Sequence, residues 1–290
     1  MPLRGKKPET IEKRFKAFFY GQPGVGKTFA AIQFPKPYLI DTERGAEQEQ
    51  YTEMLSSKGG VIFQTVEFKD LITEIKALLT EQHEYKTLII DPITTIYNNL
   101  VAHYNNIMPE QQTKTNKHYM AANKDFQYLI NMLLFKLDMN VIMTAHGKDE
   151  FSLNGSGGTT FDGYKKLPFM FDLTVEIKHQ AGKRIGYVYK TRLKEFEQHS
   201  TFDFSYEEIE KRYGKEKIDK ESAPLVLATA EQIKRFSELC AQLRYSHNML
   251  ISRLEKQNVR SIDELESSVI QTWIDALENK VKPKEEKESK

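Results

Sequence analysis

Three features are scarce in this sequence, and each scarcity excludes a class of protein. A single cysteine, Cys240, occurs in 290 residues, which excludes an intramolecular disulfide and a cysteine-rich zinc site. No apolar run approaches the roughly 20 residues that cross a bilayer, and residues 1–16 lack the apolar centre of a signal peptide. Neither charge dominates, with 42 Lys and Arg against 41 Asp and Glu, so net charge identifies no partner. We therefore expect a cytoplasmic protein with no membrane partner.

The strongest motif that is present is a phosphate-binding loop. Residues 21–28 read Gly-Gln-Pro-Gly-Val-Gly-Lys-Thr and fit the pattern G-x-x-x-x-G-K-[ST] without a mismatch. A strand-like run precedes the loop and a helix-compatible run follows it, so backbone N–H groups can turn inward on the β-phosphate. The alternative is a glycine-rich turn that precedes a lysine by chance. We expect ATP to bind the loop residues Gly21, Gln22, Pro23, Gly24, Val25, Gly26, Lys27, Thr28 and Phe29.

Within this loop two side chains have separate tasks. Lys27 is expected to reach the β- and γ-phosphates, and Thr28 is expected to hold Mg²⁺ through its hydroxyl. The buried run 87–91 ends in Asp91, which we expect beside the loop as the Walker B carboxylate that contacts Mg²⁺ through water. An aspartate that caps the next element is the alternative for Asp91.

The alternation of strand and helix patterns predicts an α/β fold. Strand candidates at 17–20, 38–41, 61–66, 87–91 and 140–145 alternate with helical patterns, which favours a mainly parallel sheet covered by helices. Two further runs, 173–177 and 185–193, flank a turn-prone segment and predict an antiparallel extension of the sheet. Capping boxes at Thr229 and Ser261 begin helices of a small C-terminal domain. The predicted division is a basic N-terminal arm (1–14), an ATPase core (15–204), a linker (205–228), a C-terminal helical domain (229–280) and a disordered charged tail (281–290).

A missing glutamate decides between classes of P-loop ATPase. The loop sequence alone would suit an AAA+ ATPase, a class that normally places its catalytic glutamate directly after the Walker B aspartate. Here Pro92 follows Asp91, so the general base must come from elsewhere. Glu43 is the best candidate, because it follows the strand 38–41 that comes next after the loop helix. A solvated carboxylate at a strand end is the alternative.

The order of these motifs resembles the RecA-like recombinase core. It is most similar to phage-encoded RecA-like nucleotide-binding proteins, which act in recombination as ATP-dependent single-strand annealing proteins; the likeness covers about residues 15–204. The resemblance implies a RecA-like P-loop NTPase core with a mainly parallel central sheet, and a homo-oligomer with ATP at its subunit interfaces. It gives Glu43 the role of polarising the attacking water. His146 or Thr144 takes the place of a γ-phosphate sensor, where RecA has glutamine, and a surface histidine is the alternative.

DNA contacts are expected after the sensor strand. The segment 154–163 contains four glycines and lies where RecA-like proteins carry a mobile DNA-binding loop, and its Phe161 and the adjacent Tyr164 could stack on bases. The run 178–194 holds six lysines and arginines and no acid. Lys190 and Arg192 share one face of a strand. They could track DNA phosphates or reach the γ-phosphate of a neighbouring subunit, as the resemblance implies; a solvated strand face is the alternative.

The sequence thus predicts an ATPase that binds single-stranded DNA and promotes annealing, encoded by a phage and active in the host cytoplasm. An alternative is a nucleotide-gated loader or assembly ATPase that acts on a protein partner in DNA replication. The C-terminal helices could then dock a single-strand DNA-binding protein or another replication protein. A small-molecule kinase is disfavoured, because no arginine-rich lid is evident and the glycine-rich segment lies beyond the last core strand.

Overall fold

A computed structural model describes all residues except 1–4, 6, 8–11, 150–158 and 289–290. The chain divides into two compact units. The α/β unit comprises residues 1–66, 84–98 and 139–222, and the helical unit comprises residues 67–83, 99–138 and 223–290. Each unit is described by itself below.

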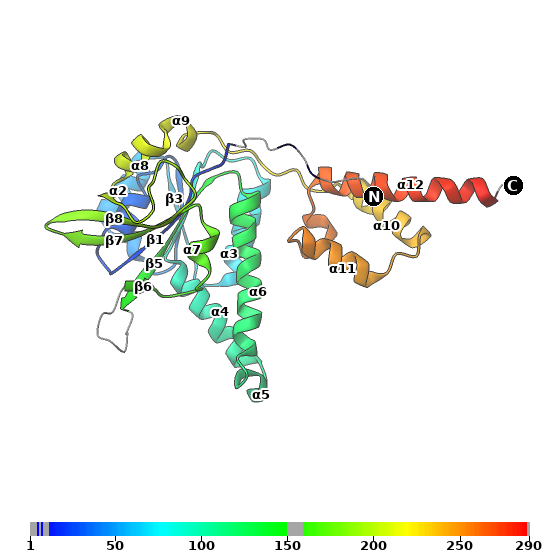
Figure 1. The fold of residues 1–290 in the computed structure, drawn as a ribbon, viewed down its shortest axis with the longest axis horizontal. Helices are drawn as coiled ribbons and strands as arrows, with labels where there is room; N and C mark the ends of the chain where they lie inside the picture. The colour runs from blue at the N-terminus through cyan, green and yellow to red at the C-terminus, as the bar shows by residue number, and fades with distance from the viewer. Residues whose placement is uncertain (1–4, 6, 8–11, 150–158, 289–290) are drawn as a thin grey trace. The chain divides into compact units, whose positions relative to one another are not determined.

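The described strands of the α/β unit form one sheet with the order β3-β2-β4-β5-β1-β7-β8-β9, and β6 pairs with β5 (Figure 1). Neighbours from β3 to β7 run parallel, whereas β8 and β9 are antiparallel additions. This arrangement confirms the fold class that the sequence predicts. The strands are β1 (Lys16–Gly21), β2 (Pro37–Asp41), β3 (Val61–Gln64), β4 (Thr87–Asp91), β5 (Asn140–Asp149), β6 (Thr159–Phe161), β7 (Leu173–Gln180), β8 (Lys183–Thr191) and β9 (Thr201–Asp203).

The central strands are buried along almost their whole length, as their continuous apolar runs require in a parallel sheet. Every residue of β1 is buried, and so are the first four residues of β4 and the first six of β5. Strand β5 lies between β1 and β4. The carboxyl ends of these three strands therefore meet at one edge of the sheet, where ligands of open α/β sheets bind.

Short helices complete the α/β unit. They are α1 (Lys27–Ala31), the 3₁₀ turn η1 (Gly45–Glu47), α2 (Glu49–Ser57), α7 (Leu167–Met170), α8 (Tyr206–Tyr213) and α9 (Lys215–Ile218), together with the beginning of α4 (Ile93–Ile107). Helices α8 and α9 occupy the segment for which the sequence predicts a linker. Their Ile209, Tyr213 and Ile218 belong to the hydrophobic core of the unit. Because charged residues lie between these apolar side chains, the composition of the segment alone does not reveal its apolar face.

The helical unit contains α3 (Phe68–Thr80), the end of α4, α5 (Glu110–Thr113), α6 (Lys117–Asn131), the π-helical turn η2 (Met132–Lys136), α10 (Ala230–Gln242), α11 (His247–Lys256), η3 (Ile262–Glu264) and α12 (Ser267–Glu288). The capping box at Thr229 is present as predicted. Phe236, Leu239 and Ile274 share a core with Trp273 at its margin. Helix α12 continues to Glu288, where the sequence predicts a disordered tail, because Lys and Glu are good helix formers.

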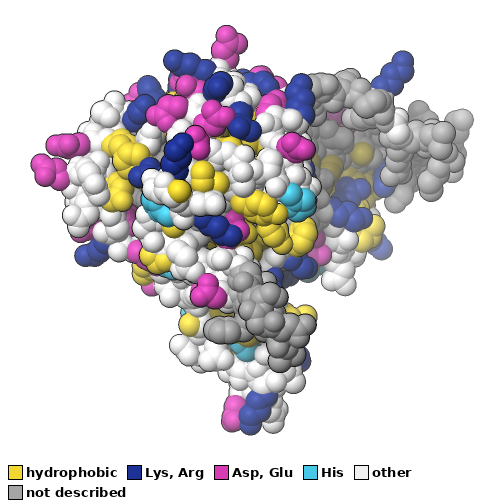
Figure 2. Space-filling view, turned by 60° about the vertical axis from the view of Figure 1, so that its left-hand side comes forward, with side chains coloured by type: hydrophobic (Ala, Val, Ile, Leu, Met, Phe, Trp, Pro, Cys, Tyr) yellow, Lys and Arg dark blue, Asp and Glu magenta, His cyan; other side chains and the backbone are white. Residues whose placement is uncertain are grey.

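Acidic and basic side chains are interspersed on the face shown in Figure 2, in line with the balanced composition. No helix among the described residues has the length and hydropathy that a membrane span requires.

Candidate nucleotide-binding site

The phosphate-binding loop connects the last residue of β1 to the first residue of α1. Gly24 and Gly26 have φ values of 78° and 90°, a region that favours glycine. A Cβ atom on Gly21 would collide with the carbonyl oxygen of Ile177 on β7. The loop therefore needs its glycines for backbone conformation at two positions and for close packing at the third.

The side chain of Lys27 is held over the loop by backbone carbonyl groups of the loop itself. Its Nζ donates hydrogen bonds to the carbonyl oxygens of Gly21, at 2.9 Å, and Gln22, at 3.0 Å. The side chain is buried, and burial lowers the pKa of Lys27, although the nearby charges of Asp91 and Glu43 partly oppose this effect. The predicted phosphate-binding lysine thus lies between the loop and the two predicted carboxylates.

Asp91 lies at the end of β4 beside the loop, as the sequence predicts. Thr28 Oγ1 donates a 2.5 Å hydrogen bond to Asp91 Oδ2, and the hydroxyl of Thr144 on β5 donates to Oδ1. Burial raises the pKa of Asp91, the two hydroxyl donors and Lys27 oppose that rise, and the charge of Asp41 adds to it. Thr144, named from the sequence as a possible sensor, therefore positions the carboxylate.

The oxygen donors present fit a magnesium ion that is shared with a nucleotide. Mg²⁺ prefers hard oxygen ligands and is usually held by one or two protein groups together with phosphates and water. Thr28 and Asp91 offer one hydroxyl and one carboxylate in direct contact. No group of three or more His, Cys, Asp or Glu that could hold a metal occurs among the described residues. These two side chains are the ones that would hold the ion.

Glu43 and His146 are brought together by the fold. His146 Nε2 lies 3.1 Å from Glu43 Oε2, and Thr95 Oγ1 donates a 2.7 Å hydrogen bond to Glu43 Oε1. Both side chains are about 40% exposed, at 40% for Glu43 and 39% for His146. His146 lies opposite Gly21 in the register of β5 with β1, so the pair stands next to the start of the loop.

A buried carboxylate fixes the turn that carries Glu43. Asp41 accepts hydrogen bonds from the backbone N–H groups of Glu43, Gly45 and Ala46 at 3.1, 3.2 and 3.0 Å. In the sequence, Asp41 is the last residue of the predicted strand 38–41. An aspartate at a strand end that is followed by a turn is the signal for this role, because its side chain can accept N–H groups a few residues on.

The chain after His146 is tied to α4. Thr94 Oγ1 donates to the carbonyl oxygen of Asp162 at 2.9 Å and accepts from the His146 N–H at 3.2 Å. The carboxylate of Asp162 accepts from Asn98 at 3.0 Å and pairs with Lys148 at 3.0 Å. These contacts connect strand β5 to the end of the glycine-rich segment.

Two residues expected to stack on DNA bases are buried, so that prediction is wrong for this structure. Phe161 is 8% exposed and packs edge-on against Phe18, with ring centroids 5.0 Å apart. Tyr164 is 4% exposed and packs near Tyr97. Phe161 ends the short strand β6, Tyr164 lies between β6 and α7, and both aromatic rings are directed inward. Residues 154–158 of the predicted DNA-binding loop lie outside the described residues.

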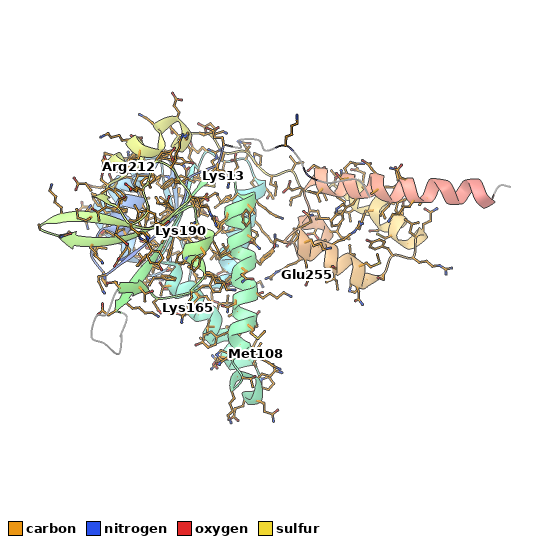
Figure 3. All side chains as sticks on the ribbon, in the orientation of Figure 1. Lys13, Met108, Lys165, Lys190, Arg212 and Glu255 are labelled. Carbon is orange, nitrogen blue, oxygen red and sulfur yellow. The ribbon has the colours of Figure 1, made fainter. Side chains whose placement is uncertain are left out.

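Lys190 and Arg192 lie at the other end of the sheet. The Arg192 N–H donates to Asp172, whose N–H donates to Lys16, so Arg192 is level with the first residue of β1, whereas the loop begins at its last. Lys190, labelled in Figure 3, donates through Nζ to the carbonyl oxygen of Phe171 just after α7.

Arg192 donates to Phe169 and Met170 carbonyls at 2.7 and 3.1 Å and pairs with Asp172. Burial, with a smaller contribution from Arg192, lowers the pKa of Lys190 to about 8. The two cations therefore do not reach the loop of their own chain.

Two cations at the end of the basic N-terminal segment, Arg14 and Lys16, are bonded to the α/β unit. Arg14 is buried and donates to the carbonyl oxygens of Lys220, at 2.7 Å, and Glu221. Lys16 Nζ donates to the carbonyl oxygen of Met139 at 2.7 Å. These two cations stabilise the α/β unit and are not exposed to a nucleic acid.

Comparison with known proteins places this site in a family. Residues 13–203, well over half of the chain, match a family model described as AAA domain. The chain belongs to this family. The matched segment contains the loop, Asp91, Glu43 and His146, so this AAA-domain protein is a nucleotide-binding P-loop NTPase.

A crystal structure of the RadB recombinase aligns with the AAA-domain protein at a TM-score of 0.44 and 16% identity, over 64% of this chain and 84% of that chain. A search of curated proteins gives no match.

Proposed function

We propose that this protein hydrolyses ATP and uses the nucleotide to control its binding to single-stranded DNA, so that it promotes annealing in recombination. The observation that carries the proposal is the 3.1 Å contact between Glu43 and His146. It joins the predicted water-activating carboxylate to the strand that leads directly into the glycine-rich segment 154–163. Loss of the γ-phosphate would alter the Glu43–His146 contact, and strand β5 would transmit that change to the candidate DNA-binding loop.

The residues of the site fit hydrolysis by in-line attack of water on the γ-phosphate. Glu43 would accept a proton from the water or orient it, while Thr95 and His146 hold the carboxylate in place. Lys27 would exchange its backbone carbonyl partners for phosphate oxygens and neutralise charge. Thr28 and Asp91 would hold Mg²⁺, which would supply positive charge against the negative charge that develops on the phosphates.

The position of Lys190 and Arg192 suits a head-to-tail oligomer. They lie near the first residue of β1, and the loop begins five residues later at Gly21, which is about 16 Å along a strand at roughly 3.3 Å per residue. A heterologous interface places one end of a subunit against the opposite end of the next. Such an interface would bring these cations to the neighbour's nucleotide, while they remain remote from their own.

Annealing of two complementary, fluorescently labelled oligonucleotides tests the proposal. The wild type with ATP and Mg²⁺ is expected to accelerate duplex formation, and the Lys27→Ala variant is expected to lose the acceleration. Wild-type protein that binds ATP but neither binds nor anneals single strands would reject the DNA function. That result would favour the loader reading, in which the C-terminal helices dock a replication protein.

A further inference from the structure

Arg184 is a cation at the loop end of the sheet. In the β7–β8 hairpin it pairs across from His179, three residues beyond Glu176, which pairs with Tyr20 of β1. Arg184 therefore lies past the end of β1, level with the phosphate-binding loop. Its carbonyl oxygen accepts a 2.8 Å hydrogen bond from the N–H of the buried Phe204, which fixes the backbone at this position. In Figure 1 the tip of this hairpin extends beyond the neighbouring strands.

The guanidinium of Arg184 contacts both sides of the Lys27–Thr28 pair. Its Cζ lies 4.6 Å from the centroid of the Phe29 ring, in stacking range. A Cβ atom placed on Gly26 would lie 2.7 Å from Arg184 Nε and 2.9 Å from its Cδ. Two observations exclude a larger residue at position 26: its φ is 90°, and Arg184 occupies the space that a Cβ atom would need.

Arg184 has no acidic partner in the described part of the chain. It forms no ion pair there, although nearby Lys178 pairs with Glu176 at 2.9 Å. The side chain is half-buried, and stacking on Phe29 leaves the N–H groups at the edge of the guanidinium able to donate. A half-buried cation without a counter-ion, against a loop whose ligand is a polyanion, is placed to bind that anion.

The sheet topology shows which part of the nucleotide Arg184 can reach. Strand β1 lies between β5 and β7. Glu43 and His146, which mark the γ-phosphate end, approach the loop from β2 and β5. Arg184 approaches from β8, on the other side of β1. A triphosphate laid along the loop with its γ-phosphate toward Glu43 directs its α-phosphate toward Arg184.

We propose that Arg184 binds the α-phosphate of the nucleotide in the same subunit, with Phe29 holding the guanidinium in place. The inference rests on the nucleotide binding in the proposed function and adds a subsite to it. An α-phosphate contact contributes equally to the binding of ADP and of a triphosphate. A contact with the γ-phosphate would contribute to the triphosphate alone.

Isothermal titration calorimetry with ADP and with the non-hydrolysable triphosphate AMP-PNP, both with Mg²⁺, tests the proposal. Arg184→Ala is expected to raise both dissociation constants by about tenfold, as loss of a hydrogen bond to a charged group does, with their ratio unchanged. Arg184→Lys keeps the charge but not the planar group that stacks on Phe29, so it is expected to lose less affinity than Arg184→Ala. Lys183→Ala is the matched control, because it removes an exposed charge from the adjacent position and should bind like the wild type.

The outcomes separate this inference from the proposed function. Wild-type affinity for both nucleotides in Arg184→Ala, with a melting temperature like that of Lys183→Ala, would overturn the α-phosphate contact and leave the ATPase proposal intact. Loss of AMP-PNP affinity alone would also overturn it. Arg184→Lys keeps the test decisive if Arg184→Ala folds poorly, since a tenfold loss in both variants would contradict a charge contact. A wild type that binds neither nucleotide would overturn both proposals.

Discussion

The cations at the two ends of strand β8 differ in whether their side chains have polar partners within the described fold. At the loop end, Arg184 stacks on Phe29 and has no acidic partner among the described residues. At the far end, Lys190 and Arg192 donate to backbone carbonyls around α7, and Arg192 also pairs with Asp172. The same basic run therefore contains one cation available to a ligand in its own subunit and two that are held in place by the fold.

The basic run 178–194 is therefore not one continuous stripe of available cations. The period of two along a strand places Lys190 and Arg192 on the same face, yet it does not reveal that the face meets the carbonyl groups of a short helix. The two proposals give the ends different roles: the loop end would complete a nucleotide site in the same subunit, and the far end would face a neighbouring subunit.

The largest effect on ATP turnover is expected when Glu43, the candidate general base beside the phosphate-binding loop, is replaced. Glu43→Gln should lower the ATP turnover number by about 10³-fold, within the range supplied by a positioned general base. The affinity for AMP-PNP should stay near that of the wild type. Steady-state phosphate release and calorimetry measure the two quantities. Glu49→Gln, an exposed carboxylate at the start of α2, is the matched control, and equal turnover in both variants would assign the base to another carboxylate.

A smaller effect is expected from the far end, and it should depend on assembly. The Lys190→Ala, Arg192→Ala double variant should lose about 100-fold in turnover when assembled, less than a full arginine finger supplies (about 10³-fold or more). Turnover measured over a protein dilution series checks this. The charge-matched control is Lys183→Ala with Lys194→Ala, two exposed residues of the same run. The same fractional loss at dilutions where the protein is monomeric would argue against action across an interface.

A third effect concerns the turn that presents Glu43. Asp41→Asn leaves one oxygen where the carboxylate accepts three N–H groups. We expect the free energy of unfolding to fall by about 2 kcal/mol, the value of a hydrogen bond to a charged group, and turnover to fall with it. Urea unfolding measures the stability, with Glu47→Gln on the same turn as the control. A variant as stable as the control would show that the three bonds do not hold this turn.

The smallest effect is a pH dependence of stability that Lys190 at the far end of β8 can cause and Arg184 at its loop end cannot. The pKa of Lys190 is lowered to about 8 from 10.5, so between these values the unfolded chain binds a proton that the native state releases. Stability should therefore rise with pH across this window, and Lys190→Met should lose that contribution. Arg184 stays charged throughout, so Arg184→Met should keep the slope. Unfolding curves from pH 7.5 to 10.5 compare the two variants, and equal slopes would contradict the assignment.

The sequence predicted those parts of the site that are encoded in short, contiguous runs of residues. The loop pattern, the apolar strand that ends in Asp91 and the strand before Glu43 each follow from a short run of residues, and the structure brings all three together. Their meeting point follows from parallel pairing, which collects carboxyl ends of strands at one edge.

Other features depend on contacts between distant segments and escaped the sequence analysis. Helices α8 and α9 look like a linker until Ile209 and Tyr213 meet the core. Phe161 seemed available to DNA because glycines precede it, but its ring packs on Phe18 and Tyr20. Arg184 was one basic residue among six, and only the hairpin register places it beside the loop.

The proposed function requires that ATP turnover at the loop is coupled to single-stranded DNA. The most direct test is the steady-state ATPase rate with and without an oligonucleotide over a salt series, beside Lys27→Ala. We predict stimulation by DNA that weakens as salt rises, because phosphate contacts release counterions, and no turnover in the variant. A rate that is indifferent to DNA at every salt concentration, with no detectable DNA binding, would contradict the claim.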